Sequence, residues 1–116
     1  MKKSTVLSIA SLVFISGCVA TPATLTEHAP DIVFHSKQQP KVVAECIHAK
    51  WESVGETIAS SRIVGTKIRV MAHIGKSRLG HMAEVEDQAG VTVVNYYEAV
   101  LAIGTNPWRD ELKTCL

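Results

Sequence analysis

The sequence predicts an α+β domain, in which an antiparallel meander of three to four strands packs against one N-terminal helix, with a short C-terminal helix alongside. Three observations predict it. Apolar residues recur at three- and four-residue spacing over 39–54, which is the period of an amphipathic helix. Alternating apolar and polar stretches then follow one another between short turns. Finally, an Asn-Pro pair near residue 106 marks the start of a second helix.

The first predicted helix runs from Gln39 to Val54. Pro40 suits its first turn, where the N–H that proline lacks would have no partner in the helix. Gly55 suits the left-handed residue that commonly follows a last turn. The charged residues of this segment, Glu45, Lys50 and Glu52, are expected on its solvent side. Its apolar stripe consists of Val43, Cys46, Ile47, Trp51 and Val54.

The clearest strand pattern covers residues 67–74. Its apolar residues alternate with Lys67, Arg69 and His73, so the two sets project from opposite faces of a sheet. We expect the apolar face to pack against the helix. The polar face is then left in water, where a partner would bind.

Two more strands are predicted at 81–87 and 91–97, each reached through a short turn. Gly90 supplies a positive φ for the second turn. On the first of these strands, Glu84 and Glu86 are expected to face solvent opposite the basic residues of the 67–74 strand. Cross-strand ion pairs explain these two acids without catalysis.

The remaining segments have weaker patterns. Residues 31–35 predict an edge strand. Residues 57–64 fit more than one structure, with Ile58 and Ile63 as candidate core residues. Residues 98–103 are expected to be extended.

The C-terminal helix is predicted from its start signals. Asn106 is a suitable N-cap and Pro107 a suitable first helical residue. Two acids follow in the early part of the helix, where the helix dipole favours negative charge. Trp108, Leu112 and Cys115 share one face, which we expect to dock on the rest of the domain.

The chain begins with features of a secretory signal peptide. Lys2 and Lys3 precede an apolar run over 6–15, and small residues follow it. The run is shorter than the ~20 apolar residues that a membrane-spanning helix needs. The alternatives are an ordinary signal peptide and a buried N-terminal helix.

The end of this segment, Ile15-Ser16-Gly17-Cys18, resembles the lipobox of bacterial lipoproteins. The resemblance implies cleavage after Gly17, a diacylglycerol on the Cys18 thiol and an acyl chain on the new amine, as palmitate or a similar fatty acid. It therefore divides the chain into a signal peptide (1–17), a lipidated cysteine with a flexible tether (18–30) and a small domain (31–116). More than one acyl chain gives a stable anchor.

The resemblance also implies a location in the cell envelope. Residue 19 is Val, whereas an Asp after the lipidated cysteine resembles a signal for retention in the inner membrane. We therefore expect a lipid anchor in the outer membrane and a domain that faces the periplasm. The domain resembles the many short lipoproteins of Gram-negative bacteria, without a closer family.

The composition argues against nucleic-acid binding. Without Lys2 and Lys3, 10 of the 12 basic side chains remain against 11 acidic ones, so the mature net charge is about −1. Aromatic residues make up only 5% of the chain, which is too few for a base-stacking platform. Five basic residues, and no acid, nevertheless occur between residues 57 and 83: Arg62, Lys67, Arg69, Lys76 and Arg78.

The chain has three cysteines. If Cys18 carries lipid, Cys46 and Cys115 remain, and a pair of thiols in an oxidising compartment predicts a disulfide. The alternatives are two free buried thiols, or a metal site with His48. The metal site is disfavoured because residues 46 and 48 point to different sides of a helix.

No catalytic residue, metal site or cofactor is predicted. His73 and His81 end one predicted strand and begin the next, so a metal pair or a pH-sensitive patch across the turn is an alternative to solvated surface histidines. No nucleophile with an adjacent base can be placed. A pocket lined by these two histidines and Glu84 would support the alternative that the protein is a small hydrolase.

We therefore expect a protein-binding module of the envelope, with an inhibitor, immunity, exclusion or assembly role. The residues predicted to contact the partner are Lys67, Arg69, His73, Tyr96 and Tyr97. The main alternative is a structural envelope lipoprotein without a dedicated partner.

Overall fold

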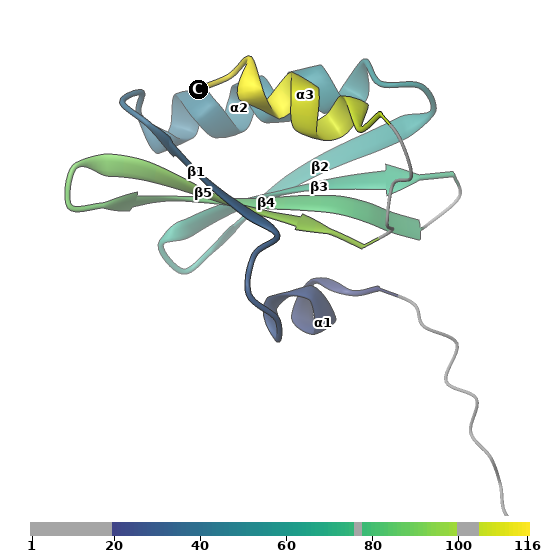
Figure 1. Ribbon diagram of the computed structural model, residues 1–116, viewed down its shortest axis with the longest axis horizontal. Coiled ribbons are helices and arrows are strands. Elements are labelled where there is room, and N and C mark those ends of the chain that lie inside the picture. Colours follow the sequence, from purple (N-terminus) through teal and green to yellow (C-terminus); the bar gives the residue numbers. More distant parts are fainter. Residues whose placement is uncertain (1–19, 76–77, 100–104) are drawn as a thin grey trace, which may run out of the picture.

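The computed structural model describes residues 20–75, 78–99 and 105–116. Within them the elements follow the order α1 (Pro22–Thr26), β1 (Ile32–Ser36), α2 (Pro40–Glu52), β2 (Thr57–Val64), β3 (Lys67–Ile74), β4 (Arg78–Gln88), β5 (Val91–Glu98) and α3 (Pro107–Lys113). The strands form one antiparallel sheet in the order β1-β5-β4-β3-β2. The helices α2 and α3 cover one face of this sheet, and α1 lies on the side of the other face (Figure 1). The α+β class is confirmed.

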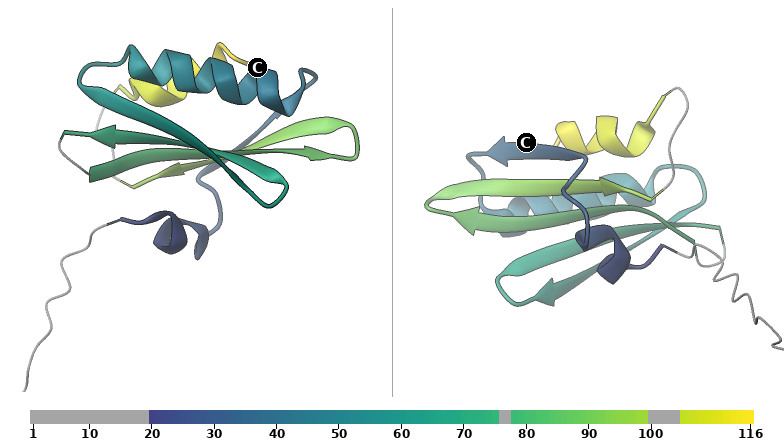
Figure 2. Two further views of the ribbon diagram at one scale, coloured as in Figure 1. Left: turned by 180° about the vertical axis from the view of Figure 1, so that it is seen from behind. Right: turned by 60° about the horizontal axis from the view of Figure 1, so that its bottom comes forward.

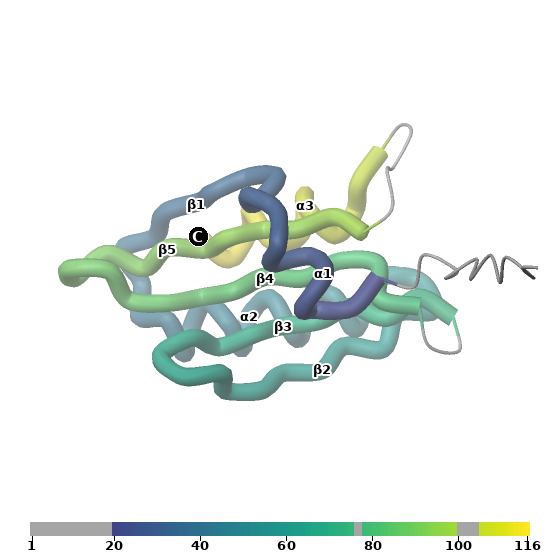
Figure 3. The backbone as a smooth tube through the Cα atoms, turned by 90° about the horizontal axis from the view of Figure 1, so that it is seen from below, coloured from purple at the N-terminus to yellow at the C-terminus, as the bar shows by residue number. Residues whose placement is uncertain are grey.

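The sheet is larger than the sequence predicted. It has five strands instead of three or four, because residues 57–64 form a full edge strand and β1 adds to β5 at the opposite edge. The strand β4 also begins at Arg78, inside the predicted turn. The tube in Figure 3 shows the strands side by side, with α1 under the open face.

The predicted flexible tether contains a short helix. A capping box holds the start of α1, because the Thr21 side chain accepts from the Thr24 N–H and the Thr24 side chain accepts from the Thr21 N–H. Pro22 occupies the first turn. The described residues contain no helix that is long and apolar enough to cross a membrane.

The core lies between the sheet and the helix layer. The buried residues of α2 are Val43, Ala44, Ile47 and Trp51, and all of them except Ala44 belong to the predicted stripe. They pack on residues of every second position in the central strands, among them Val70, Ala83, Val85 and Val94. The inward-facing residues at alternate strand positions and the buried residues on one side of α2 therefore form one apolar layer.

Two tight turns fix the register of the meander. Gly65 (φ +61°) is the first residue of the two-residue β2–β3 turn, where glycine avoids a steric cost. Ala89 and Gly90 both have positive φ in the β4–β5 turn, as predicted for Gly90. Between these turns, β3 and β4 pair with one bulge near Ala72 and His73.

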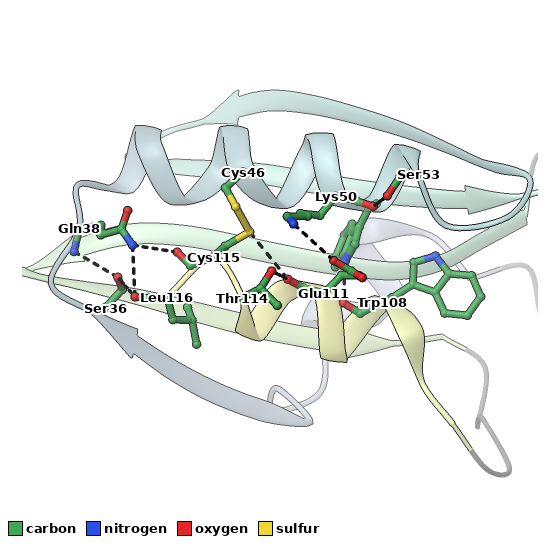
Figure 4. Close-up of a disulfide and its surroundings, with 11 residues drawn as sticks. Ser36, Gln38, Cys46, Lys50, Ser53, Trp108, Glu111, Thr114, Cys115 and Leu116 are labelled. Atoms are coloured by element: carbon green, nitrogen blue, oxygen red, sulfur yellow. Dashed lines mark hydrogen bonds and ion pairs between the residues drawn. A yellow bond between two sulfur atoms is a disulfide. The ribbon is translucent and has the colours of Figure 1, made fainter.

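A disulfide holds the C-terminal segment against α2 (Figure 4). Cys46 and Cys115 are bonded, as predicted, with their Cα atoms 5.7 Å apart. Gln38 Nε2 donates to the carbonyl oxygens of Cys115 and Leu116, both at 3.3 Å. At the other end of α3, the Trp51 indole N–H donates to the Trp108 carbonyl oxygen at 2.8 Å. The helix α3 is therefore held at both ends.

Removal of this disulfide should lower stability without changing the fold. The bond closes a loop with a sequence separation of 69 residues, and a loop of this length contributes about 4 kcal/mol in the chain-entropy description. The double variant Cys46→Ala/Cys115→Ala should lose up to that amount in urea unfolding, relative to the oxidised protein. The reduced wild type is the control. A loss below about 1 kcal/mol would show that the contacts of Gln38 and Trp51 hold α3 in place without the disulfide.

Candidate functional site

The open face of the sheet, opposite the helix layer, carries a partly buried ion pair at its centre. Arg69 and Glu84 are direct cross-strand neighbours, as predicted. Arg69 Nη2 lies 3.1 Å from Glu84 Oε2, and Arg69 Nε lies 3.3 Å from the same oxygen. The expectation that Glu84 faces solvent is wrong, because its side chain is 3% exposed and that of Arg69 only 15%. The pair is part of the packing of this face.

Tyr97 and Met82 are direct neighbours on the same face, and both are buried. Burial raises the pKa of the Tyr97 hydroxyl, and the nearby Glu84 carboxylate adds to this effect. The helix α1 lies beneath this part of the sheet (Figures 1 and 3). The centre of the open face is therefore not a water-exposed binding surface.

The five predicted contact residues do not form one surface. Lys67, Arg69, His73 and Tyr97 belong to the open face, where Arg69 is mostly buried and Tyr97 fully so. Tyr96 points to the opposite face and lies in the core with no exposed surface. The structure therefore removes Tyr96 from the predicted contact surface.

A second set of polar and aromatic residues lies between the sheet and α3, with His81, Tyr96 and Asn106 buried and the others half-buried. The His81 ring lies 4.3 Å from the Trp108 ring and 6.0 Å from the Tyr96 ring, nearly parallel to both. The His81 Nδ1 atom is 2.7 Å from the Tyr96 hydroxyl oxygen. Asn106 Nδ2 donates to that hydroxyl at 3.1 Å and also donates to Glu98. We name His81, Tyr96, Glu98, Asn106 and Trp108 the buried polar cluster.

Burial controls the charge states in this cluster. It lowers the pKa of His81 to about 4, because an imidazolium between two aromatic rings loses its hydration. Burial likewise raises the pKa of Tyr96 well above its ordinary value. Both groups are therefore neutral at pH 7, and they stabilise the junction of β4, β5 and α3 by hydrogen bonds.

The expectation that His73 and His81 are solvated surface histidines is wrong for His81, which is 1% exposed, and the alternative, a pair of the two histidines, is not formed either. His81 is paired with Ala72, and both face the helix layer, whereas His73 follows Ala72 and faces the other way. Glu84 is also on the open face, so the pocket that would have supported a hydrolase is absent from the described residues. No group of three metal-ligating side chains is found in that part of the chain. Cys46 is disulfide-bonded, which contradicts a metal site with His48.

The strand β2 forms an open edge beside an apolar groove. Ile58 and Ile63 were candidate core residues, but they are 64% and 77% exposed. Ile63 borders a groove of about 370 Å³ between α2 and the sheet. The residues that line this groove are Lys41, Ala44, Glu45, Ser61, Ile63 and Ile68. We name this groove, with the outer edge of β2, the β2-edge site.

The backbone of this edge offers a row of hydrogen-bonding groups. Val64 and Lys67 flank a two-residue turn and form a hydrogen-bonded pair, so the even-numbered residues of β2 bond to β3. The groups of Ala59, Ser61 and Ile63 consequently point away from the sheet. In the described part of the chain, no backbone partner is recorded for these three residues. The exposed edge therefore resembles a template for one more strand.

The chain was also compared with known proteins. No protein-family model, no curated protein and no solved structure matches it.

The sequence pointed to the open face and missed the β2-edge site. The only signal for that site was a pair of apolar residues, Ile58 and Ile63, whose separation of five fits neither one strand face nor one helix face. The predicted lipid site, Cys18, lies outside the described residues, as does most of the 98–103 segment that was expected to be extended.

Acid should destabilise the domain through His81. The unfolded chain binds a proton at His81 near pH 6.5, but the folded chain binds it only near pH 4, so stability falls as the pH drops through this interval. The free energy of unfolding should fall by about 2 to 3 kcal/mol between pH 7 and 4.5. The measurement is urea unfolding at both pH values.

The variant His81→Phe provides the comparison. It keeps a ring between Trp108 and Tyr96 and cannot take up the proton, so its stability should depend far less on pH in this interval. If the free energy of unfolding of the variant falls equally steeply with pH, groups other than His81 cause the pH dependence.

Proposed function

We propose that this protein is a lipoprotein anchored in the outer membrane through Cys18, and that its domain binds a protein partner in the periplasm. The sequence supports the anchor through the basic start, the apolar run and the Ile15-Ser16-Gly17-Cys18 box. The disulfide between Cys46 and Cys115 agrees with an oxidising compartment. No catalytic role is proposed.

The β2-edge site is the observation that carries the binding role. An extended segment of a partner can add to a sheet edge through its backbone, while alternate side chains enter pockets beside the edge. In this domain, Ala59, Ser61 and Ile63 offer the backbone groups, and the groove next to Ile63 offers an apolar pocket. We therefore propose an extended, partly apolar protein segment as the bound element.

The β2-edge site differs from the contact surface that the sequence predicted. The sequence favoured the face with Lys67, Arg69 and His73, but α1 lies beneath that face and the ion pair at its centre is packed. The β2 edge has no covering strand in the described residues. A structural lipoprotein without a partner remains the second candidate, although no specific observation favours it.

The anchor predicts a defined chemical change at residue 18. Labelling growing cells with a clickable palmitate analogue should mark the wild type, and the variant Cys18→Ala should carry no label. Mass spectrometry of the mature wild type should begin at an acylated Cys18. An unmodified thiol at that position would contradict the anchor.

The binding mode predicts that a backbone change on the edge abolishes partner capture. Ser61→Pro removes an N–H that points away from the sheet, so the domain should fold while the added strand loses a hydrogen bond. A photo-crosslinking residue at position 63 should give one discrete adduct in intact cells, and Ser61→Pro should reduce it at least fivefold. Thermal unfolding checks the fold.

Two controls make this test specific. Ser61→Ala keeps the N–H and loses only the hydroxyl that bonds to His48, so its adduct should persist. The crosslinker at the exposed Lys113 on α3 should give no such adduct. Equal adducts with Pro and Ala at position 61 would exclude strand addition.

A further inference from the structure

We propose that the open face of the sheet, on the side of α1, rests on the phospholipid surface that holds the anchor, so that the helix layer points away from the bilayer. This inference rests on the lipid anchor of the proposed function. It adds the orientation of the domain and the chemistry of the face that meets the lipid.

Few residues separate the predicted lipid site, Cys18, from the helix α1. Residue 18 precedes the first described residue, Ala20, by two positions, and an extended chain spans at most about 3.6 Å per residue. The helix α1 then begins at Pro22 behind the capping box of Thr21. The helix α1 shortens the reach of the segment between residue 18 and the sheet, because a helical residue advances the chain by only about 1.5 Å.

The described chain begins on the open-face side of the domain. All three ribbon views place α1 on the side of the open face, away from α2 and α3 (Figures 1 and 2). The segment behind α1 is fixed to β5, because the Asp31 N–H donates to the Tyr96 carbonyl oxygen at 2.9 Å. In addition, Asp31 Oδ2 accepts from the Glu98 N–H at 2.7 Å. The described chain therefore begins on the open-face side of the sheet.

The chemistry of the open-face side suits a phospholipid surface. The helix α1, PATLT, has no charged residue. On the open face, the register places Arg62 directly opposite Arg69. Glu84 neutralises Arg69, whereas no ion pair is recorded for Arg62 among the described residues.

Apolar residues accompany this charge. The exposed side chains of Ile58 and Val33 lie at the two edges of the same face. A guanidinium that binds a lipid phosphate, next to aliphatic side chains that enter the headgroup region, is the pattern of an interfacial surface. Two exposed lysines of the helix layer are in contrast paired, Lys41 with Glu45 and Lys50 with Glu111.

The test uses a fluorophore on either side of the domain. With Cys46 and Cys115 bonded and Cys18 acylated, one introduced cysteine is the single free thiol. Ile58→Cys labels the open face, and Val42→Cys labels the helix layer at a similarly exposed aliphatic position, 49% against 64%. The purified lipidated protein is placed in vesicles of phosphatidylethanolamine and phosphatidylglycerol that contain a headgroup-nitroxide lipid.

We expect quenching by the nitroxide to be at least threefold greater at position 58 than at position 42. Equal quenching, or greater quenching at position 42, would overturn the orientation. Mass spectrometry of the same sample separates the two proposals. An acylated protein with equal quenching overturns the orientation alone, and a protein without acylation at Cys18 overturns the proposed anchor and this inference together.

A charge reversal tests the lipid chemistry. Arg62→Glu/Lys67→Glu should reduce quenching at position 58 at least twofold, because both side chains would then repel phosphate. Lys41→Glu/Lys113→Glu, which changes the same charge in the helix layer, should leave it unchanged. If the open-face reversal also leaves quenching unchanged, a lipid contact of this face is excluded.

Discussion

The side chain of Trp51 lies where the main parts of this domain meet. It extends from α2 into the core, with its ring 6.3 Å from that of Tyr96 in the sheet and 6.4 Å from that of His81. Its indole N–H donates to the Trp108 carbonyl oxygen and thereby holds α3. A single buried aromatic residue thus connects both helices of the layer to the central strands. The disulfide supports the same junction from the other end of α3.

This junction also explains why polar groups are tolerated in the core. His81, Tyr96 and Asn106 have partners within the buried polar cluster, so their burial leaves few lost hydrogen bonds to water. The Trp108 indole N–H likewise finds Thr57 Oγ1 at 3.0 Å. Burial also restricts the charge state of the cluster, because it lowers the pKa of His81 and so favours the neutral ring.

Local signals predicted much of the fold. The helix α2, the strand β3, the Gly90 turn and the Asn106 cap each depend on residues close in sequence, and they were predicted to within a few residues. The disulfide followed from the number of cysteines and the expected compartment. The leader and Cys18 lie outside the described residues, so their interpretation rests on the sequence alone.

The errors arose where contacts between distant segments decide the outcome. Tyr96 and Tyr97 were both placed on the contact surface, but neighbours on a strand point to opposite faces, and only one of them can share a face with Arg69. Glu84 looked solvent-exposed because its burial depends on Arg69, its partner on the neighbouring strand. The β2-edge site combines Ala44 of α2 with Ile63 and Ile68 of a hairpin, a combination that no local pattern contains.

The pairing of β1 with β5 has a consequence for the order of assembly. The register joins Ile32 to Tyr96, so more than half of the chain separates the two partners. The meander from β2 to β5 needs only sequential hairpins, whereas β1 has no neighbour in the sheet until β5 has formed. We therefore expect β1 to be the last strand to join the sheet, so that the domain completes its folding at the strand nearest in sequence to the proposed anchor.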